Sequence, residues 1–254
     1  MARAPAADLS SLRILYYGSS PMPAEWIRAA IAAFPGTEIV QGYGLTETAP
    51  ILTVLPHRTH IEALERGDPA PLASAGWPVP LVDLRVFDDD GAEVAPGVAG
   101  ELVVRGPNLM TGYLGRPDET AQALRDGWFH TGDVGIIGAD GLVTLLDRKK
   151  DMIISGGENV YSSEVEAVLY QHPGVAEAAV IGVPDDLYGE AVMAVVAALP
   201  GTRLSESDLV EHCRGRIAGY KIPRRVAVVE ALPKSAVGKI LKSDLRRAYG
   251  GDQT

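Results

Sequence analysis

Residues 13–44 have the pattern of strand, helix and strand in succession. RILYYG (13–18) is predicted to be a strand, and Pro23 is then well placed to begin the helix AEWIRAAIAAF, which ends at a Pro-Gly pair. EIVQGYG (38–44) is the next predicted strand. This order predicts a βαβ unit, in which the two strands are parallel and the helix lies in the crossover connection.

Two loops, GSSP (18–21) and GYGLTET (42–48), follow the predicted strands. The carboxyl ends of parallel strands meet at one sheet edge, which is where such sheets bind ligands. Thr46, Glu47 and Thr48 offer two hydroxyls and a carboxylate, the ligand types that suit a phosphate and its magnesium ion. A simple turn would need only the glycines.

Residues 74–147 are predicted to form short strands joined by turns. LRVFDDDGAEV and GIIGADGLVTLL each place Asp-Gly between alternating apolar residues, which predicts hairpins. The run Asp88-Asp89-Asp90 is interpreted as a solvated turn, because no calcium-loop spacing follows it. His57 and His60 lack further metal ligands at suitable spacing, so we predict a polar surface segment there.

From Lys150 onward the pattern is that of a compact α+β unit of about 100 residues, a size that can fold alone. Ser163 and Glu166 match a capping box at the start of a helix. AEAAVIGV, AVMAVVAAL and RVAVVEAL are predicted strands. A helix is predicted over 207–218, and the basic segment KSDLRRAY is predicted to form a last helix.

The composition excludes several classes of protein. The 254 residues include 33 acidic and 23 basic ones, for a net charge of −10, which argues against a broad nucleic-acid surface. The apolar run at 191–199 is far shorter than the roughly 20 residues of a membrane span. The N-terminal stretch lacks the apolar region of a signal peptide. Cys213 is the only cysteine, which fits a reducing compartment, and its helical spacing from Leu209 and Val210 predicts core packing. We expect a cytoplasmic protein.

Seven segments occur in an order that resembles the signature motifs of the adenylate-forming enzymes. They are YYGSSPMP, GYGLTET, GELVVRGPNLMTGYL, GWFHTGDVG, LLDRKKDMIISGGENVYSSEVE, GYKIPRR and LPKSAVGKI. The resemblance covers residues 9–247 and is closest to acyl-CoA synthetases of the fatty-acid or aryl-acid type. It implies ATP, Mg²⁺ and coenzyme A as cofactors. It also implies that a small-molecule carboxylic acid is converted to acyl-CoA through an acyl-adenylate, with release of pyrophosphate and AMP.

The resemblance implies a nucleotide site in the first 150 residues. Thr46 matches the hydroxyl donor to the α-phosphate, and Glu47 matches the magnesium ligand. Asp133 matches the ribose ligand, and Arg148 matches its cationic partner. The residues that border the nucleotide and the acyl group are Gly18, Ser19, Ser20, Gly42, Tyr43 and Gly44, with Tyr43 against the adenine ring.

The resemblance also implies a mobile C-terminal domain. Lys150 matches the hinge residue about which this domain turns between the two half-reactions. Gly156 and Gly157 match the lining of the pantetheine tunnel. Tyr220 and Arg224 are candidates for the coenzyme A nucleotide, or alternatively belong to a basic surface loop. Lys239 in LPKSAVGKI matches the catalytic lysine of the adenylation step.

The Ser/Thr/Gly-rich phosphate loop ending in Pro-Lys-Gly that precedes these motifs in the family does not occur in the 254 residues. The predicted fold class is therefore an α/β remnant (9–55) plus a small β-barrel-like subdomain (74–147), followed by a mobile α+β domain. The predicted domains are 1–149 and 150–254. Three functions remain open: the C-terminal part of an acyl-CoA ligase, part of an acyl-AMP ligase that delivers to a carrier protein, and a non-catalytic nucleotide- or partner-binding remnant.

Overall fold

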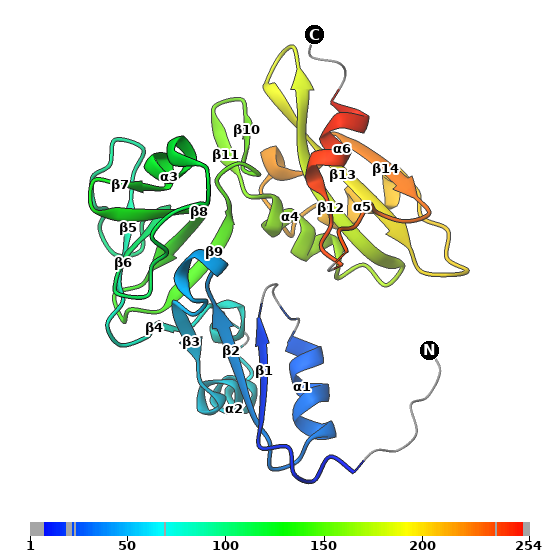
Figure 1. The fold of residues 1–254 in the computed structure, drawn as a ribbon. Helices are drawn as coiled ribbons and strands as arrows, with labels where there is room; N and C mark the ends of the chain where they lie inside the picture. The colour runs from blue at the N-terminus through cyan, green and yellow to red at the C-terminus, as the bar shows by residue number, and fades with distance from the viewer. Residues whose placement is uncertain (1–7, 19–21, 23, 69, 237, 251–254) are drawn as a thin grey trace. The chain divides into compact units, whose positions relative to one another are not determined.

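The computed structural model describes residues 8–18, 22, 24–68, 70–236 and 238–250 (Figure 1). The chain divides into two compact units, residues 1–145 and 146–254. The first unit contains two sheets, and the second unit contains one. In the described part of the chain no helix combines the length and the apolar character that crossing a membrane requires.

The first sheet contains the predicted βαβ unit. Strands β1 and β2 are parallel, with Ile14 opposite Glu38 and Gly18 opposite Gly42, which confirms that prediction. Strands β3 and β4 extend the sheet in the order β1-β2-β3-β4. The elements of this layer are β1 (Ile14–Gly18), α1 (Ala24–Ala33), β2 (Glu38–Tyr43), the 3₁₀ turn η1 (Thr46–Thr48), β3 (Thr53–Leu55), α2 (His57–Arg66), η2 (Ala70–Ala73) and β4 (Trp77–Pro78).

Helix α2 occupies the segment for which we predicted a polar surface, and that prediction is wrong. His60 is fully buried in this helix. Its Nε2 lies 2.8 Å from the hydroxyl oxygen of Tyr17, and its Nδ1 lies 2.9 Å from the carbonyl oxygen of Pro56. Burial lowers the pKa of His60. The hydrogen bonds satisfy the ring at both nitrogens, which allows a polar side chain to pack in the core.

The second sheet has strand order β5-β6-β8-β7, with β9 also paired to β8. The predicted hairpin at 135–146 is confirmed by this β8–β9 pair. After β5 the chain also returns antiparallel at the predicted Asp-Gly turn: a bridge joins Phe87 to Glu93, and the N–H groups of Asp88 and Val94 donate to the carbonyls of Ala92 and Val86. A barrel-like closure stays a prediction. The elements are β5 (Asp83–Phe87), β6 (Gly100–Arg105), α3 (Pro117–Ala123), β7 (Leu124–Arg125), β8 (Trp128–Ile137) and β9 (Val143–Arg148).

The second unit is built around the long antiparallel pair β12–β13, with β14 parallel to β13. Neighbouring residues alternate between two cores: Val180 faces helices α4 and α5, and Ile181 faces helix α6. Cys213 is buried in the first of these cores, as predicted. The elements are β10 (Ile153–Ser155), β11 (Glu158–Val160), α4 (Ser162–Leu169), β12 (Val175–Asp185), β13 (Gly189–Ala198), α5 (Glu206–Cys213), η3 (Gly219–Lys221), β14 (Arg225–Val229) and α6 (Lys242–Tyr249).

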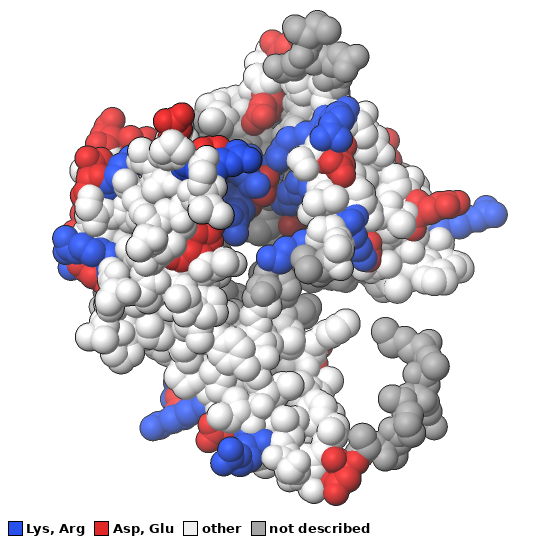
Figure 2. All heavy atoms as spheres, viewed as in Figure 1, with Lys and Arg blue, Asp and Glu red and all other residues white. Residues whose placement is uncertain are grey.

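Two helix predictions in the second unit need correction. Ser163 and Glu166 do not form a capping box: the N-cap of α4 is Tyr161, without a side-chain cap, and Glu166 accepts from the backbone N–H of Val180. Helix α5 ends at Cys213 rather than near 218. The capping box occurs at the start of α5 instead, between Ser205 and Asp208. Charges of both signs share the visible face of this unit (Figure 2).

Candidate active site

The TET sequence forms the 3₁₀ turn η1 directly after β2. The buried Thr48 hydroxyl closes the turn, because it accepts from the N–H of Leu45 at 3.0 Å and donates to the carbonyl of Leu45 at 2.9 Å. Thr46 is exposed, and Glu47 is half-buried. Thr48 is therefore a structural residue, while Thr46 and Glu47 remain available for a ligand.

Residues 108–113 hold this turn from a distant part of the sequence. The side-chain amide of Asn108 donates to the carbonyl of Thr48 at 2.7 Å, and the N–H of Met110 donates to the carbonyl of Glu47 at 2.8 Å. The Tyr113 hydroxyl donates to Oε1 of Glu47 at 2.9 Å. Burial raises the pKa of Tyr113, and Glu47 adds to that effect. Nothing in the spacing of Asn108 or Tyr113 along the chain links them to residue 47, so the sequence alone did not identify either residue.

The predicted adenine and ribose residues lie together in the first unit. The Tyr43 hydroxyl donates to Oδ2 of Asp133 at 2.7 Å. Asp133 lies where the β6–β8 pairing shifts its register, between Glu101 and Val103. The buried carboxylate of Glu101 accepts from the N–H of Gly132 at 3.2 Å and fixes the irregular backbone beside Asp133. A bulge of this kind is a common way to aim a functional side chain.

Three of the predicted glycines have packing reasons of their own. A Cβ on Gly18 would lie 2.4 Å from the Gly42 carbonyl oxygen. On Gly42 it would lie 1.3 Å from the Tyr16 hydroxyl, and on Gly44 it would lie 1.8 Å from the Pro50 carbonyl oxygen. A close approach to a nucleotide at these positions stays a prediction. Ser19 and Ser20 lie outside the described residues.

Arg148 is the last residue of β9, and Lys150 lies in the turn that follows this strand; both are exposed. Gly156 and Gly157 form the two-residue turn between β10 and β11, with φ of 62° and 85°. Both angles are positive, as in the hairpin turns that favour glycine at both central positions. Lys239 lies in the exposed loop before α6, where its N–H donates to the Ser235 hydroxyl at 3.2 Å.

Tyr220 and Arg224 have separate partners. The guanidinium of Arg224 lies 3.8 Å from the ring centroid of Tyr188, whereas the Tyr220 ring lies beside Lys221, whose Nζ is 5.6 Å from its centroid. Lys221 also pairs with Glu164 at 2.6 Å. Tyr188 contacts the glycine turn as well, since its carbonyl accepts from the N–H of Gly156 at 2.8 Å. Tyr188 therefore connects Arg224 to the turn at Gly156-Gly157, a connection that the sequence alone did not predict.

The donor set limits how a metal is held. The described residues contain no group of three or more His, Cys, Asp and Glu side chains suited to a metal ion. The single carboxylate of Glu47 in the η1 turn fits Mg²⁺, because this ion binds through one or two carboxylates together with substrate phosphates. A tightly held, all-protein metal site would need more ligands.

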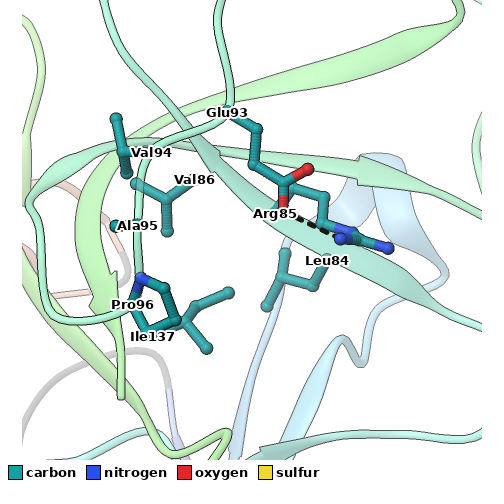
Figure 3. A pocket seen from close by; sticks show the side chains of 8 residues that line it. All are labelled: Leu84, Arg85, Val86, Glu93, Val94, Ala95, Pro96 and Ile137. Atoms are coloured by element: carbon teal, nitrogen blue, oxygen red, sulfur yellow. Dashed lines mark hydrogen bonds and ion pairs between the residues drawn. The ribbon is translucent and has the colours of Figure 1, made fainter. Parts of the chain in front are cut away.

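One hollow lies elsewhere in the first unit. Its volume is about 220 Å³, and β5, residues 93–96 and Ile137 line it (Figure 3). An ion pair between Arg85 and Glu93 at 2.8 Å closes one side. No predicted site residue contributes to it, so the hollow does not mark the candidate site.

Two family models match the chain in the order that the motifs predict. The model for AMP-binding enzymes matches residues 1–114, and the model for the C-terminal domain of AMP-binding enzymes matches residues 164–239. The chain belongs to the AMP-binding enzymes. Within this adenylate-forming superfamily its sequence is similar to enzymes named as acyl-CoA synthases and CoA ligases.

Relatives and a solved structure resemble nearly the whole chain. A feruloyl-CoA synthase from Amycolatopsis sp. is 48% identical over 245 residues, which are 96% of this chain and 48% of the relative. A long-chain-fatty-acid–CoA ligase from Salmonella typhimurium is 43% identical, with 94% and 41% covered. The structure of the amide bond synthetase McbA from Marinactinospora thermotolerans superposes with a TM-score of 0.83 at 38% identity, covering 96% of this chain and 48% of that one. The chain thus spans about half the length of these AMP-binding enzymes.

Proposed function

We propose that these residues are the C-terminal portion of an ATP-dependent acyl-CoA ligase. In the first half-reaction a carboxylate oxygen attacks the α-phosphorus of ATP, and pyrophosphate leaves. In the second, the thiol of coenzyme A attacks the acyl carbonyl, and AMP leaves with the bonding pair while a base takes the thiol proton. One relative of this chain is named a feruloyl-CoA synthase and another a long-chain-fatty-acid–CoA ligase, and the chain covers 48% and 41% of them.

The first unit binds the nucleotide in this proposal. Thr46 donates its hydroxyl to the α-phosphate, and Glu47 is the protein ligand of Mg²⁺, which neutralises phosphate charge. Tyr113 orients the Glu47 carboxylate through its 2.9 Å hydrogen bond. Tyr43 lies against the adenine, and Asp133 accepts from the ribose hydroxyls. Both half-reactions depend on such positioning and charge neutralisation more than on covalent catalysis.

The second unit supplies the remaining groups. Lys239 reaches between the attacking carboxylate and the α-phosphate, where an ammonium group offsets the repulsion between two anions. Arg148 pairs with the ribose and phosphate. Lys150 is the hinge between domains 1–149 and 150–254, and the turn at Gly156-Gly157 lines the path of the pantetheine arm. Tyr220 and Arg224 contact the coenzyme A nucleotide. We assign the enzyme to the cytoplasm.

One observation supports this proposal more than any other: the hydrogen bond between Tyr43 and Asp133 at 2.7 Å. The two residues are 90 positions apart and come from different motifs, yet the fold joins the proposed adenine and ribose residues next to the η1 turn. A surface turn with no ligand would not require such a meeting of motifs.

A second candidate concerns the acyl acceptor. The structural neighbour McbA is named an amide bond synthetase, so proteins of this fold include one that transfers to an amine. Delivery of the acyl group from the adenylate to a carrier protein is the alternative that we predicted from the sequence. The Arg224–Tyr188 pair favours coenzyme A, because a cation suits the phosphates of its nucleotide, whereas the pantetheine arm that the glycine turn in SGGENV would accommodate is common to coenzyme A and the carrier protein.

The complete polypeptide that contains these residues tests the proposal. A panel of aryl and long-chain acids is supplied with ATP and Mg²⁺, pyrophosphate is measured, and the acyl product is identified by mass with coenzyme A, an amine or a pantetheinylated carrier protein present. We expect acid-dependent pyrophosphate release and acyl-CoA. Pyrophosphate release without acyl-CoA would favour another acceptor. No acid-dependent release would leave only a nucleotide- or partner-binding role.

A further inference from the structure

Helix α6 begins three residues after Lys239, and two of its cations reach other parts of the second unit. Nζ of Lys242 lies 2.7 Å from Oε1 of Glu166 and 2.5 Å from the Ser162 hydroxyl, both on α4. Nη2 of Arg246, one helical turn later, lies 2.7 Å from Oδ1 of Asp151. The contacts with Ser162 and Asp151 connect α6 to residues 80 and 95 positions earlier in the chain.

The Lys242 contact extends to the segment that precedes Arg148. The Ser162 hydroxyl donates to Oδ2 of Asp147 at 2.7 Å, and the Ser162 N–H donates to the same oxygen at 2.5 Å. The other oxygen of Asp147 accepts from the N–H of Arg148 at 2.7 Å. Lys242 thus reaches Asp147 through one serine, and Arg246 reaches Asp151. The segment 147–151 contains Arg148 and Lys150. Side chains of the same helix therefore hold both of its ends in position, at Asp147 and at Asp151.

The loop that carries Lys239 is fixed to the start of this helix. The N–H of Leu241, the N-cap of α6, donates to the carbonyl of Pro233 at 2.9 Å, and the N–H of Ser235 donates to the carbonyl of Lys239 at 2.8 Å. Leu245 anchors the helix in the core. The orientation of α6 therefore determines where the loop lies within the second unit.

Ser162, Glu166 and Lys242 form a polar cluster beside α6, and its burial costs free energy of desolvation. Ser162 is fully buried, and the side chains of Glu166 and Lys242 are 19% and 17% exposed. Burial raises the pKa of Glu166 despite the neighbouring ammonium group. Partly buried ion pairs contribute little net stability, because desolvation offsets their attraction, but they tolerate few alternative geometries. Stability alone gives this cluster no advantage over an apolar contact.

We propose that α6 is a clamp that holds the segment 147–151 and the Lys239 loop in one fixed arrangement. Lys242 and Arg246 are its positioning residues, and Asp147 and Asp151 are its two attachment points. The inference rests on the proposed function, in which Arg148 and Lys239 serve the same adenylation step. While the clamp is closed, residues 147–151 move with α6, so a rotation centred on Lys150 requires release of the Asp147 attachment.

Amide hydrogen exchange in the 254-residue chain tests the clamp without any ligase activity, so its failure is distinguishable from failure of the proposed function. Lys242→Met is expected to speed exchange of the Ser162 amide by about tenfold, since its acceptor Asp147 is no longer restrained. Arg246→Met is expected to do the same at the Asp151 and Met152 amides, which donate to the carbonyl of Arg148. Arg247→Met is the matched control, because among the described residues the ion pair of Arg247 is with Asp244 of the same helix.

A double variant separates positioning from stability. Glu166→Gln combined with Lys242→Met removes both charges and keeps an acceptor for the Val180 N–H. We expect a thermal midpoint close to that of the wild type, together with fast exchange at Ser162 and in the loop 235–241. Wild-type exchange rates in this double variant would overturn the proposal, because Lys242 would then serve only to neutralise Glu166. Equal effects of Arg247→Met and Lys242→Met would overturn it as well.

Discussion

The sheets of the two units differ in how completely their faces are covered. In the second unit, α4 and α5 cover one face of the β12–β13 pair and α6 covers the other. In the first sheet of the first unit, α1 and α2 share a single core with Tyr17 of β1. Ile14 and Tyr16, on the opposite face of the same strand, are 56% and 49% exposed. Parallel strands are ordinarily covered on both faces.

This difference indicates which unit can stand alone. The second unit covers both faces of its long β12–β13 pair and ties residues 147–151 to its last helix, although Val228 of β14 remains 44% exposed. The first unit exposes apolar side chains at a parallel edge strand, and Trp26 of α1 is exposed as well. Exposed apolar surface beside an unpaired strand edge favours association. Most of the proposed nucleotide residues, Arg148 excepted, thus belong to the less self-sufficient unit.

Separate expression of the two units should give the largest effect, and it tests directly whether only the second unit folds on its own. A piece comprising residues 146–254 retains Asp147 and both of its cores, so it should be soluble and unfold cooperatively. Residues 1–145 should aggregate, because their edge strand and apolar face stay uncovered. Gel filtration and thermal melts check both pieces. A monomeric, cooperative first piece with an insoluble second one would reverse our assignment.

Adenylation by the 254 residues alone tests whether the first unit is sufficient for chemistry. We expect no useful rate, because the chain has no Ser/Thr/Gly-rich phosphate loop to align the pyrophosphate leaving group. Loss of one oxyanion donor costs roughly 10²–10³ in rate, and here an entire set of donors is missing. Carboxylate-dependent ATP–pyrophosphate exchange is the measurement. Robust exchange by the purified chain would show that the remaining residues suffice.

Lys239→Ala in the complete enzyme tests one proposed contribution of the second unit to adenylation. Adenylation should fall by at least about 10²-fold, since the developing charge loses its ammonium partner. Conversion of supplied acyl-adenylate to acyl-CoA should stay near the wild-type rate. Lys234→Ala is the matched control from the same motif; Lys234 forms an exposed ion pair with Glu177, which contributes little. Equal damage to both half-reactions would contradict the assignment.

Mild acid should weaken the first unit by a small amount. Burial lowers the pKa of His60 in the folded protein. The unfolded chain, in which histidine has a pKa of about 6.5, therefore binds the proton more tightly than the folded protein does. Stability therefore falls as the pH drops below that value. Urea unfolding followed by tryptophan fluorescence reports this unit, because Trp26, Trp77 and Trp128 all lie in it. His60→Gln should flatten the pH dependence; an unchanged slope in this variant would refute the role of His60.

Local sequence patterns identified most of the secondary structure. The βαβ unit, the β8–β9 hairpin, the strands of the second unit and α6 all follow from apolar periodicity and turn residues, which act over a few positions. The capping box assigned to Ser163 and Glu166 failed because tertiary partners took both side chains. Ser163 donates to the carbonyl of Leu146, and Glu166 pairs with Lys242.

The sequence by itself determined the order of the motifs, the strand and helix types and the family. Only the tertiary structure decided which of these residues meet. Tyr43 meets Asp133 across 90 positions, and Glu47 meets Tyr113 across 66. Lys242 reaches back 80 positions to Ser162. Periodicity and turn chemistry describe neighbours along the chain, whereas these hydrogen bonds depend on strand register, a bulge and the packing of whole helices, which arise only when distant segments fold together.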